Sequence, residues 1–217
     1  MEVCAISTGS CGNAYVINSN DNYVLLDCGV RFQDITHHPK FPKFSELDFV
    51  FISHCHRWNG DHNKSLKDFK KSGCEIVSYE TLQPKPQKHR IGDWEATTFP
   101  VAHNVPCWGI ILKHTITGEK LTYMTDFFKA PMIENCPEFI FEVNYIDAFI
   151  DEMIDENKDL KHLGFNNHCS LEYATEYFTN MKTRPKKIYC CHGSKSHSIK
   201  KRIYEGMKQF ADEVVVL

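Results

Sequence analysis

The sequence predicts a single α+β domain that spans residues 1–217. Short runs of β-branched and aromatic residues fill its first half, whereas the clearest amphipathic helical patterns come late in the chain. Histidine and aspartate residues stand at the ends of several of the strand-like runs. Hydrophobic residues make up 42% of the chain, which is enough for a continuous core.

The first three strands are expected to form an antiparallel meander. Turn-rich segments separate them, at residues 7–13 and 18–22. Gly9 and Gly12 in the first turn would let a backbone approach phosphate oxygens, but they suit a plain hairpin turn equally well. Residues 31–38 are ambiguous, with one helical turn as an alternative to a loop. The expected strands are 2–6, 14–17 and 23–26.

The remainder of the chain mixes strands and helices. Residues 81–89 contain two prolines and are expected to form a loop. The apolar segment 139–152 contains one strand, expected to end near Asp151 and Glu152. Apolar residues at helical spacing predict helices over 61–72, 170–181 and 198–210. The other expected strands are 48–53, 75–78, 95–101, 108–113, 120–125, 187–191 and 214–217.

One stretch, residues 53–62, concentrates metal-binding side chains. It reads Ser-His-Cys-His-Arg-Trp-Asn-Gly-Asp-His and follows a buried apolar strand. Imidazole and carboxylate groups are ligands for Zn²⁺, Mn²⁺ and Fe. Because side chains alternate along a strand, His54 and His56 would face the same side and Cys55 the other.

This stretch resembles the His-x-His-x-Asp-His motif of the metallo-β-lactamase superfamily. Further motifs follow in that family's order along almost the whole chain. They are the Gly/Ser-rich turn 7–13, Asp27-Cys28-Gly29 after a strand, and His103, Asp126 and His192, each near a strand end. The resemblance implies a four-layer αββα sandwich, the metallo-β-lactamase fold, where periodicity alone indicates only mixed α and β structure.

The motif departs from the family pattern in one place. Four residues, Arg57 to Gly60, stand where the family usually has one. We expect a bulged loop that keeps Asp61 and His62 facing inward, with Asp61 capping the next helix. The alternative is a distorted or lost second metal site. Trp58 in this loop is expected either to contact substrate or to pack on the surface.

The resemblance implies two divalent transition-metal ions, Zn²⁺ or Mn²⁺, held by seven ligands. Between the ions, a hydroxide available near neutral pH would attack an electrophilic carbonyl or phosphorus atom. The first ion would take His54, His56 and His103; the second Asp61, His62 and His192; and Asp126 would bridge both.

Asn167-His168-Cys169-Ser170 resembles a His-Ser-Thr segment of the tRNA 3′-processing endonucleases in this superfamily. By that resemblance His168 is the general acid that protonates the leaving oxygen, and Glu152, after an apolar run, orients its imidazole. Asp61 joins these two as the third expected catalytic residue. A His168 that only caps a helix is the alternative.

The resemblance favours a metal-dependent phosphodiesterase that acts on nucleic acid or on a cyclic nucleotide. A bridging aspartate at 126 is absent from lactam-cleaving members and present in phosphodiester and thioester hydrolases. A carboxyl-ester or thioester hydrolase, and a non-catalytic binding module with a degenerate second site, remain the alternatives. A homodimer that completes the pocket is left open.

The sequence patterns lead us to expect a cytoplasmic protein that does not enter a membrane. The first ten residues lack the pattern of a secretory signal, and no apolar run is long enough to span a bilayer. The ten cysteines are therefore expected to stay reduced. Cys107, close after His103, is a minor candidate for the site. The net charge of −3 argues against a wide basic face but permits local basic patches, for which residues 182–187 and 195–202 are candidates.

Overall fold

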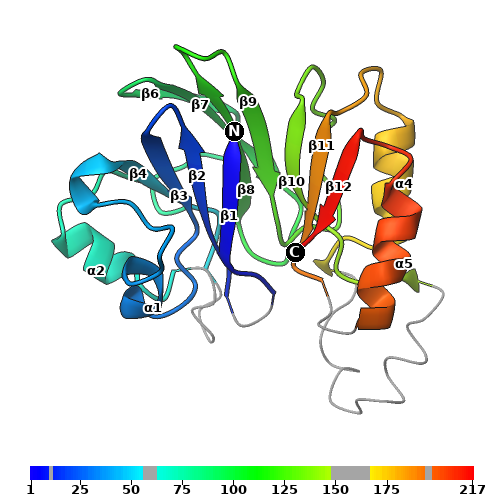
Figure 1. The fold of residues 1–217 in the computed structure, drawn as a ribbon, viewed down its shortest axis with the longest axis horizontal. Coiled ribbons are helices and arrows are strands. Elements are labelled where there is room, and N and C mark those ends of the chain that lie inside the picture. The colour runs from blue at the N-terminus through cyan, green and yellow to red at the C-terminus, as the bar shows by residue number, and fades with distance from the viewer. Residues whose placement is uncertain (10–11, 56–62, 148–166, 194–196) are drawn as a thin grey trace.

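A computed structural model describes residues 1–9, 12–55, 63–147, 167–193 and 197–217. Two β-sheets face each other and helices cover their outer faces (Figure 1). The five-stranded sheet has the order β1-β2-β3-β4-β5, and the seven-stranded sheet has the order β12-β11-β10-β9-β8-β7-β6. This confirms the predicted αββα sandwich.

The five-stranded sheet begins with the expected meander. Strands β1 to β3 pair antiparallel, whereas β4 and β5 continue the sheet in parallel pairing. Its elements are β1 (Glu2–Ser7), β2 (Ala14–Ser19), β3 (Asn22–Leu26), β4 (Leu47–Ile52) and β5 (Ile76–Ser78), with α1 (Phe32–Thr36), the 3₁₀ helix η1 (Phe44–Glu46) and α2 (Leu66–Lys71) beside them.

The seven-stranded sheet is antiparallel from β6 to β9 and parallel from β9 to β12. Its elements are β6 (Gln87–Ile91), β7 (Trp94–Val101), β8 (Cys107–His114), β9 (Lys120–Met124), β10 (Glu138–Glu142), β11 (Lys187–Cys191) and β12 (Glu213–Val216), with helices α4 (Leu171–Thr179) and α5 (His197–Met207).

Three apolar clusters hold the four layers together. The central cluster joins the sheets through side chains such as Phe49, Phe51 and Tyr123, all fully buried. A second cluster packs α4 and α5 on the outer face of the seven-stranded sheet, and a third packs α1 and α2 on the other sheet. Successive side chains of a strand face opposite sides of its sheet, and an apolar cluster lies on each side. Continuous runs of β-branched and aromatic residues can therefore bury both faces of these strands.

Two expectations about the elements are wrong, and a third lies partly outside the described residues. Residues 87–89, expected to belong to the loop 81–89, are part of β6, because this edge strand pairs only with β7 and so tolerates Pro84 and Pro86 just before it. The strand within 139–152 ends at Glu142, and the strand end expected near Asp151 and Glu152 lies outside the described residues. Helix α2 begins at Leu66 with Ser65 as its N-cap residue, later than the helix start expected at residue 61.

The described cysteines are all free thiols. No helix in the described part of the chain has both the length and the apolar character needed to cross a membrane.

Candidate metal centre

The site lies where strands from both sheets end at one edge, the lower edge in Figure 1. His54 follows β4, His103 follows β7, Asp126 follows β9, and His192 follows β11 directly. Glu142 is the last residue of β10. Because β9, β10 and β11 run parallel, three of these side chains come from neighbouring strand ends.

Two of these strand ends turn sharply. Asp126 and His192 have φ angles of 55° and 59°, in the left-handed region that is uncommon for residues other than glycine. Asp27, at the end of β3, has φ 58°. Such strained positions persist only where the surroundings fix them, and they gather at functional sites. The turns redirect the chain immediately after each strand.

The first candidate ligand group is His54, His103 and Asp126, whose ligand atoms lie within 4.8 Å of one another. His54 Nε2 is 4.0 Å from Asp126 Oδ1, and both side chains are buried. His54 Nδ1 lies 3.0 Å from Ser53 Oγ, and His103 Nδ1 lies 3.0 Å from Asn167 O. Because Nδ1 of each ring has its own partner, Nε2 is the atom each ring offers to an ion.

The second candidate group is Asp126, His168 and His192. Asp126 Oδ1 is 3.7 Å from His168 Nδ1 and 3.6 Å from His192 Nε2. Asp126 therefore belongs to both groups, and its carboxylate stands between them. The imidazole rings of His168 and His192 stack with centroids 5.1 Å apart.

A buried glutamate lies behind the second group. Glu142 Oε1 is 2.7 Å from His168 Nδ1 and 3.0 Å from His192 Nδ1, and Glu142 Oε2 accepts a hydrogen bond from Phe127 N at 3.0 Å. The carboxylate is fully buried, so it can orient both rings without access to solvent.

The electrostatics of the site favour cations. Burial alone would lower the pKa of His192, but the nearby Asp126 and Glu142 carboxylates outweigh it and raise that pKa to about 9. The same two carboxylates raise the pKa of His168 against the effect of burial. Burial would raise the pKa of Glu142, yet His168 and His192 hold it below its usual value. Buried carboxylates and imidazoles together form a donor set that fits Zn²⁺ or Mn²⁺.

The N-terminal loop braces the site from one side. Thr8 Oγ1 accepts a hydrogen bond from His192 N at 2.9 Å. Asn13 Nδ2 donates to Thr125 Oγ1 at 3.1 Å, and Thr125 Oγ1 donates to Asp126 Oδ2 at 2.8 Å. The described part of the 7–13 turn therefore positions side chains of the candidate ligand groups, a role the sequence did not indicate.

Asp27 supports His54 from behind. Its carboxylate accepts hydrogen bonds from Ser53 N at 2.7 Å, Ser53 Oγ at 2.9 Å and Tyr123 OH at 2.5 Å, and it is fully buried. Ser53 in turn contacts His54 Nδ1. Asp27 therefore links the two sheets and fixes the strand end that carries His54.

We expect Asp27→Ala to lower the free energy of unfolding by about 1–3 kcal/mol, because it leaves buried donors without an acceptor. Urea unfolding of the metal-free protein measures this loss. Asp27→Asn is the matched variant: it keeps the shape and one acceptor oxygen and should lose less. Equal stability of Asp27→Ala and the wild type would contradict the supporting role.

The structure thus brings together five of the residues singled out in the sequence: His54, His103, Asp126, His168 and His192. The other four, His56, Asp61, His62 and Glu152, lie outside the described residues, as do Trp58 and the rest of the Arg57–Gly60 insertion. The ligand roles expected of His56, Asp61 and His62 stay predictions. So does the role of Glu152, although the contact to His168 expected of it is made by Glu142.

Sequence reasoning missed Glu142, Asn144 and the supporting role of Asp27. Glu142 ends the apolar run Phe139-Ile140-Phe141, the same signal that suggested Glu152 ten residues later. Asn144 Nδ2 donates to His192 O at 2.9 Å, which the sequence does not signal. Cys107 is buried with a pKa raised by that burial, and its Sγ lies 3.6 Å from Thr125 O. This thiol packs in the core instead of joining the candidate ligand groups.

Comparison with known proteins identifies the fold. No protein-family model matches the chain, and no curated protein matches it in sequence. Solved structures do match. The metallo-β-lactamase fold protein YhfI from Bacillus subtilis superposes with a TM-score of 0.72 at 17% identity, covering 99% of this chain and 95% of that one.

Two further structures superpose over most of their length. The short form of human tRNase Z has a TM-score of 0.63 at 16% identity, covering 100% of this chain and 96% of that one. A diphosphatase from the PhnP family has a TM-score of 0.59 at 12% identity, covering 88% and 86%. At these identities the matches show the fold, and the chain has the metallo-β-lactamase fold.

Proposed function

We propose that this protein, built on the metallo-β-lactamase fold, is a metal-dependent phosphodiesterase that hydrolyses a phosphodiester bond in nucleic acid or a nucleotide. One observation carries the proposal: the Asp126 carboxylate belongs to two clusters of potential ligands. A carboxylate so placed suits two neighbouring cations. The superposition on a tRNase and on a diphosphatase supports phosphorus chemistry in preference to ester or thioester cleavage.

His54, His103 and Asp126 would hold one ion, and Asp126 and His192 would contribute to a second, completed by the expected ligands His56, Asp61 and His62. When bound, two such ions lower the pKa of water and neutralise the charge on a phosphoryl group. Asp27 and Ser53 keep His54 in place, and Thr8 and Asn144 do the same for His192.

His168 has the geometry of a proton donor. Its Nδ1 faces the Glu142 carboxylate at 2.7 Å, and the side chain is 25% exposed, whereas Glu142 is fully buried. With Nδ1 held by Glu142, Nε2 is the atom that can give a proton to a leaving oxygen. The neighbouring carboxylate also stabilises the protonated ring, which a general acid requires.

Metal titration and a substrate panel test the proposal together. Protein stripped with a chelator should regain about two Mn²⁺ or Zn²⁺ ions per chain. The loaded protein should hydrolyse bis-p-nitrophenyl phosphate and an oligonucleotide or cyclic nucleotide, whereas a thioester substrate should be cleaved poorly. Elemental analysis gives the stoichiometry, and released p-nitrophenol gives the rate.

Each competing result has a distinct meaning. A stoichiometry of one would support the distorted second site that the Arg57–Gly60 insertion suggested. Thioester cleavage faster than phosphodiester cleavage would favour the alternative hydrolase. Failure to bind metal would remove the basis of the proposal.

A further inference from the structure

A groove of about 460 Å³ lies on the outer face of the seven-stranded sheet, over strands β6 to β9. Helices α4 and α5 pack over β10 to β12 on this side of the sheet (Figure 1). Ile111 lines the groove and also packs against the cluster under those helices, which places the groove beside them on the same face.

Strand register brings basic residues from separate parts of the chain into the groove. Arg90 pairs with Glu95, Glu95 with Lys113, and Lys113 with Lys120, so these four side chains form one row across four strands. In the next row Lys88 pairs with Thr97, and Thr97 with Ile111. Directly opposed residues share a face of the sheet, so both rows face the groove.

Cations exceed carboxylates in this groove. Three lysines and one arginine line it, against one carboxylate among the described lining residues, that of Glu95. Glu95 is 3.0 Å from Lys113 Nζ and 4.0 Å from Arg90 Nη1, and all three side chains are well exposed. The groove is therefore strongly positive in a chain whose net charge is −3.

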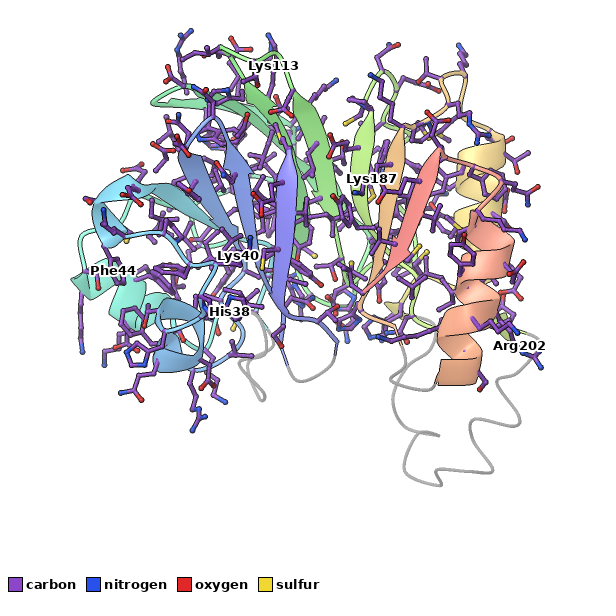
Figure 2. The ribbon with its side chains drawn as sticks, in the orientation of Figure 1. His38, Lys40, Phe44, Lys113, Lys187 and Arg202 are labelled. Carbon is purple, nitrogen blue, oxygen red and sulfur yellow. The ribbon has the colours of Figure 1, made fainter. Side chains whose placement is uncertain are left out.

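The basic run 182–187, one of the two candidates suggested by the sequence, differs from this groove. Arg184 pairs there with Asp212 at 3.3 Å, and Lys187 pairs with Glu213 at 2.7 Å. Figure 2 shows Lys187 on the strands near α5, whereas Lys113 lies at the upper end of the sheet. Local pairing leaves the 182–187 run with less charge to offer a ligand than the groove has.

We propose that the groove over β6 to β9 binds the phosphate backbone of single-stranded nucleic acid, so that the substrate is a polymer that extends beyond the metal centre. This inference rests on the proposed phosphodiesterase function and names its substrate class. Four strands spaced about 4.8 Å apart span roughly 14 Å. A row of that length can contact several successive phosphates of one strand.

Two further features suit this ligand. Ile111 and the aliphatic stems of the lysines provide an apolar floor against which bases can pack. Strand β9 connects the groove to the metal centre, because Lys120 begins it and Asp126 follows its end. Six residues at about 3.3 Å each place the two sites roughly 20 Å apart, a distance that an oligonucleotide of about ten residues can span.

Fluorescence anisotropy with a labelled 12-nucleotide single-stranded RNA tests the groove. The measurement is made in EDTA, so that neither metal binding nor cleavage contributes. The triple variant K88Q/K113Q/K120Q should lower affinity about tenfold and flatten the slope of log K against log[NaCl] by about two, at roughly 0.7 per lost phosphate contact. The matched control K182Q/K186Q/K201Q removes the same charge from exposed positions elsewhere and should leave the slope unchanged.

A second variant tests the same groove by gain of binding. Glu95→Gln removes the carboxylate that pairs with Lys113 and Arg90, so it should tighten RNA binding and steepen the salt dependence. If the triple lysine variant bound RNA weakly only because it was partly unfolded, Glu95→Gln would not bind RNA more tightly than the wild type.

Kinetics separate this inference from the proposed function. With metal, the triple variant should raise KM for the oligonucleotide and leave hydrolysis of bis-p-nitrophenyl phosphate unchanged. A wild type that binds RNA in EDTA but cleaves no phosphodiester would overturn the function and leave the groove supported. Equal losses of RNA affinity in the test and control triple variants would overturn the proposal that the groove binds nucleic acid. Poly-glutamate that competed as strongly as unlabelled RNA would also overturn it.

Discussion

Asp126→Ala should abolish phosphodiester hydrolysis and remove high-affinity metal binding at the same time. The carboxylate is shared by both candidate ligand groups, so its loss would weaken both ions. Removing a single hydrogen bond to a transition state typically costs about 10²–10³-fold in rate, and we expect the loss of a shared ligand to exceed about 10³-fold. Activity on bis-p-nitrophenyl phosphate and metal content after dialysis measure the two effects.

The metal-free Asp126→Ala protein should still fold. Asp126 and Glu142 both lie against His168 and His192, so removing Asp126 relieves repulsion between the carboxylates. It costs the hydrogen bond from Thr125 and some attraction to the two rings, which Glu142 still contacts. We therefore expect the Tm without metal to stay close to that of the wild type, and the rise in Tm on adding metal to be lost. Asp93→Ala, in the β6–β7 turn at the opposite edge of the sheet, is the control and should keep both activity and metal response.

An Asp126→Ala variant with full activity would refute the shared-ligand role. If that variant lost activity but kept two tightly bound ions, Asp126 would act on substrate instead. Circular dichroism shows whether the metal-free variant is folded. A variant that failed to fold would show that Asp126 is a structural residue.

Strand ends were the most predictable part of the molecule. β-branched and aromatic runs predicted β4, β9 and β11, and the polar residues that follow them supplied His54, Asp126 and His192. Local sequence carries this information, because a buried strand must end where its side chains turn polar. The family resemblance then added the order of the layers, which periodicity could not provide.

Features that depend on long-range pairing were not predictable. β6 is polar, and it becomes a strand only because β7 is available to pair with it. Glu142 and Glu152 both follow apolar runs, and only the parallel pairing of β10 with β9 and β11 places Glu142 beside two histidines. The basic groove likewise depends on register, since its cations are far apart in the sequence.

His168→Ala should lose much more activity on a natural phosphodiester than on bis-p-nitrophenyl phosphate. An alkoxide leaving group needs a proton, whereas p-nitrophenolate does not, and a general acid typically contributes about 10²–10⁴-fold. Glu142→Gln should show the same selectivity more weakly, because Glu142 orients the imidazole of His168 and stabilises its protonated form. Glu152→Gln is the comparison variant: the same selective loss there would support the orienting role predicted for Glu152, and full activity would assign that role to Glu142 alone. Equal losses on both substrates in His168→Ala would instead make His168 a metal ligand, since it lies 3.7 Å from Asp126 Oδ1.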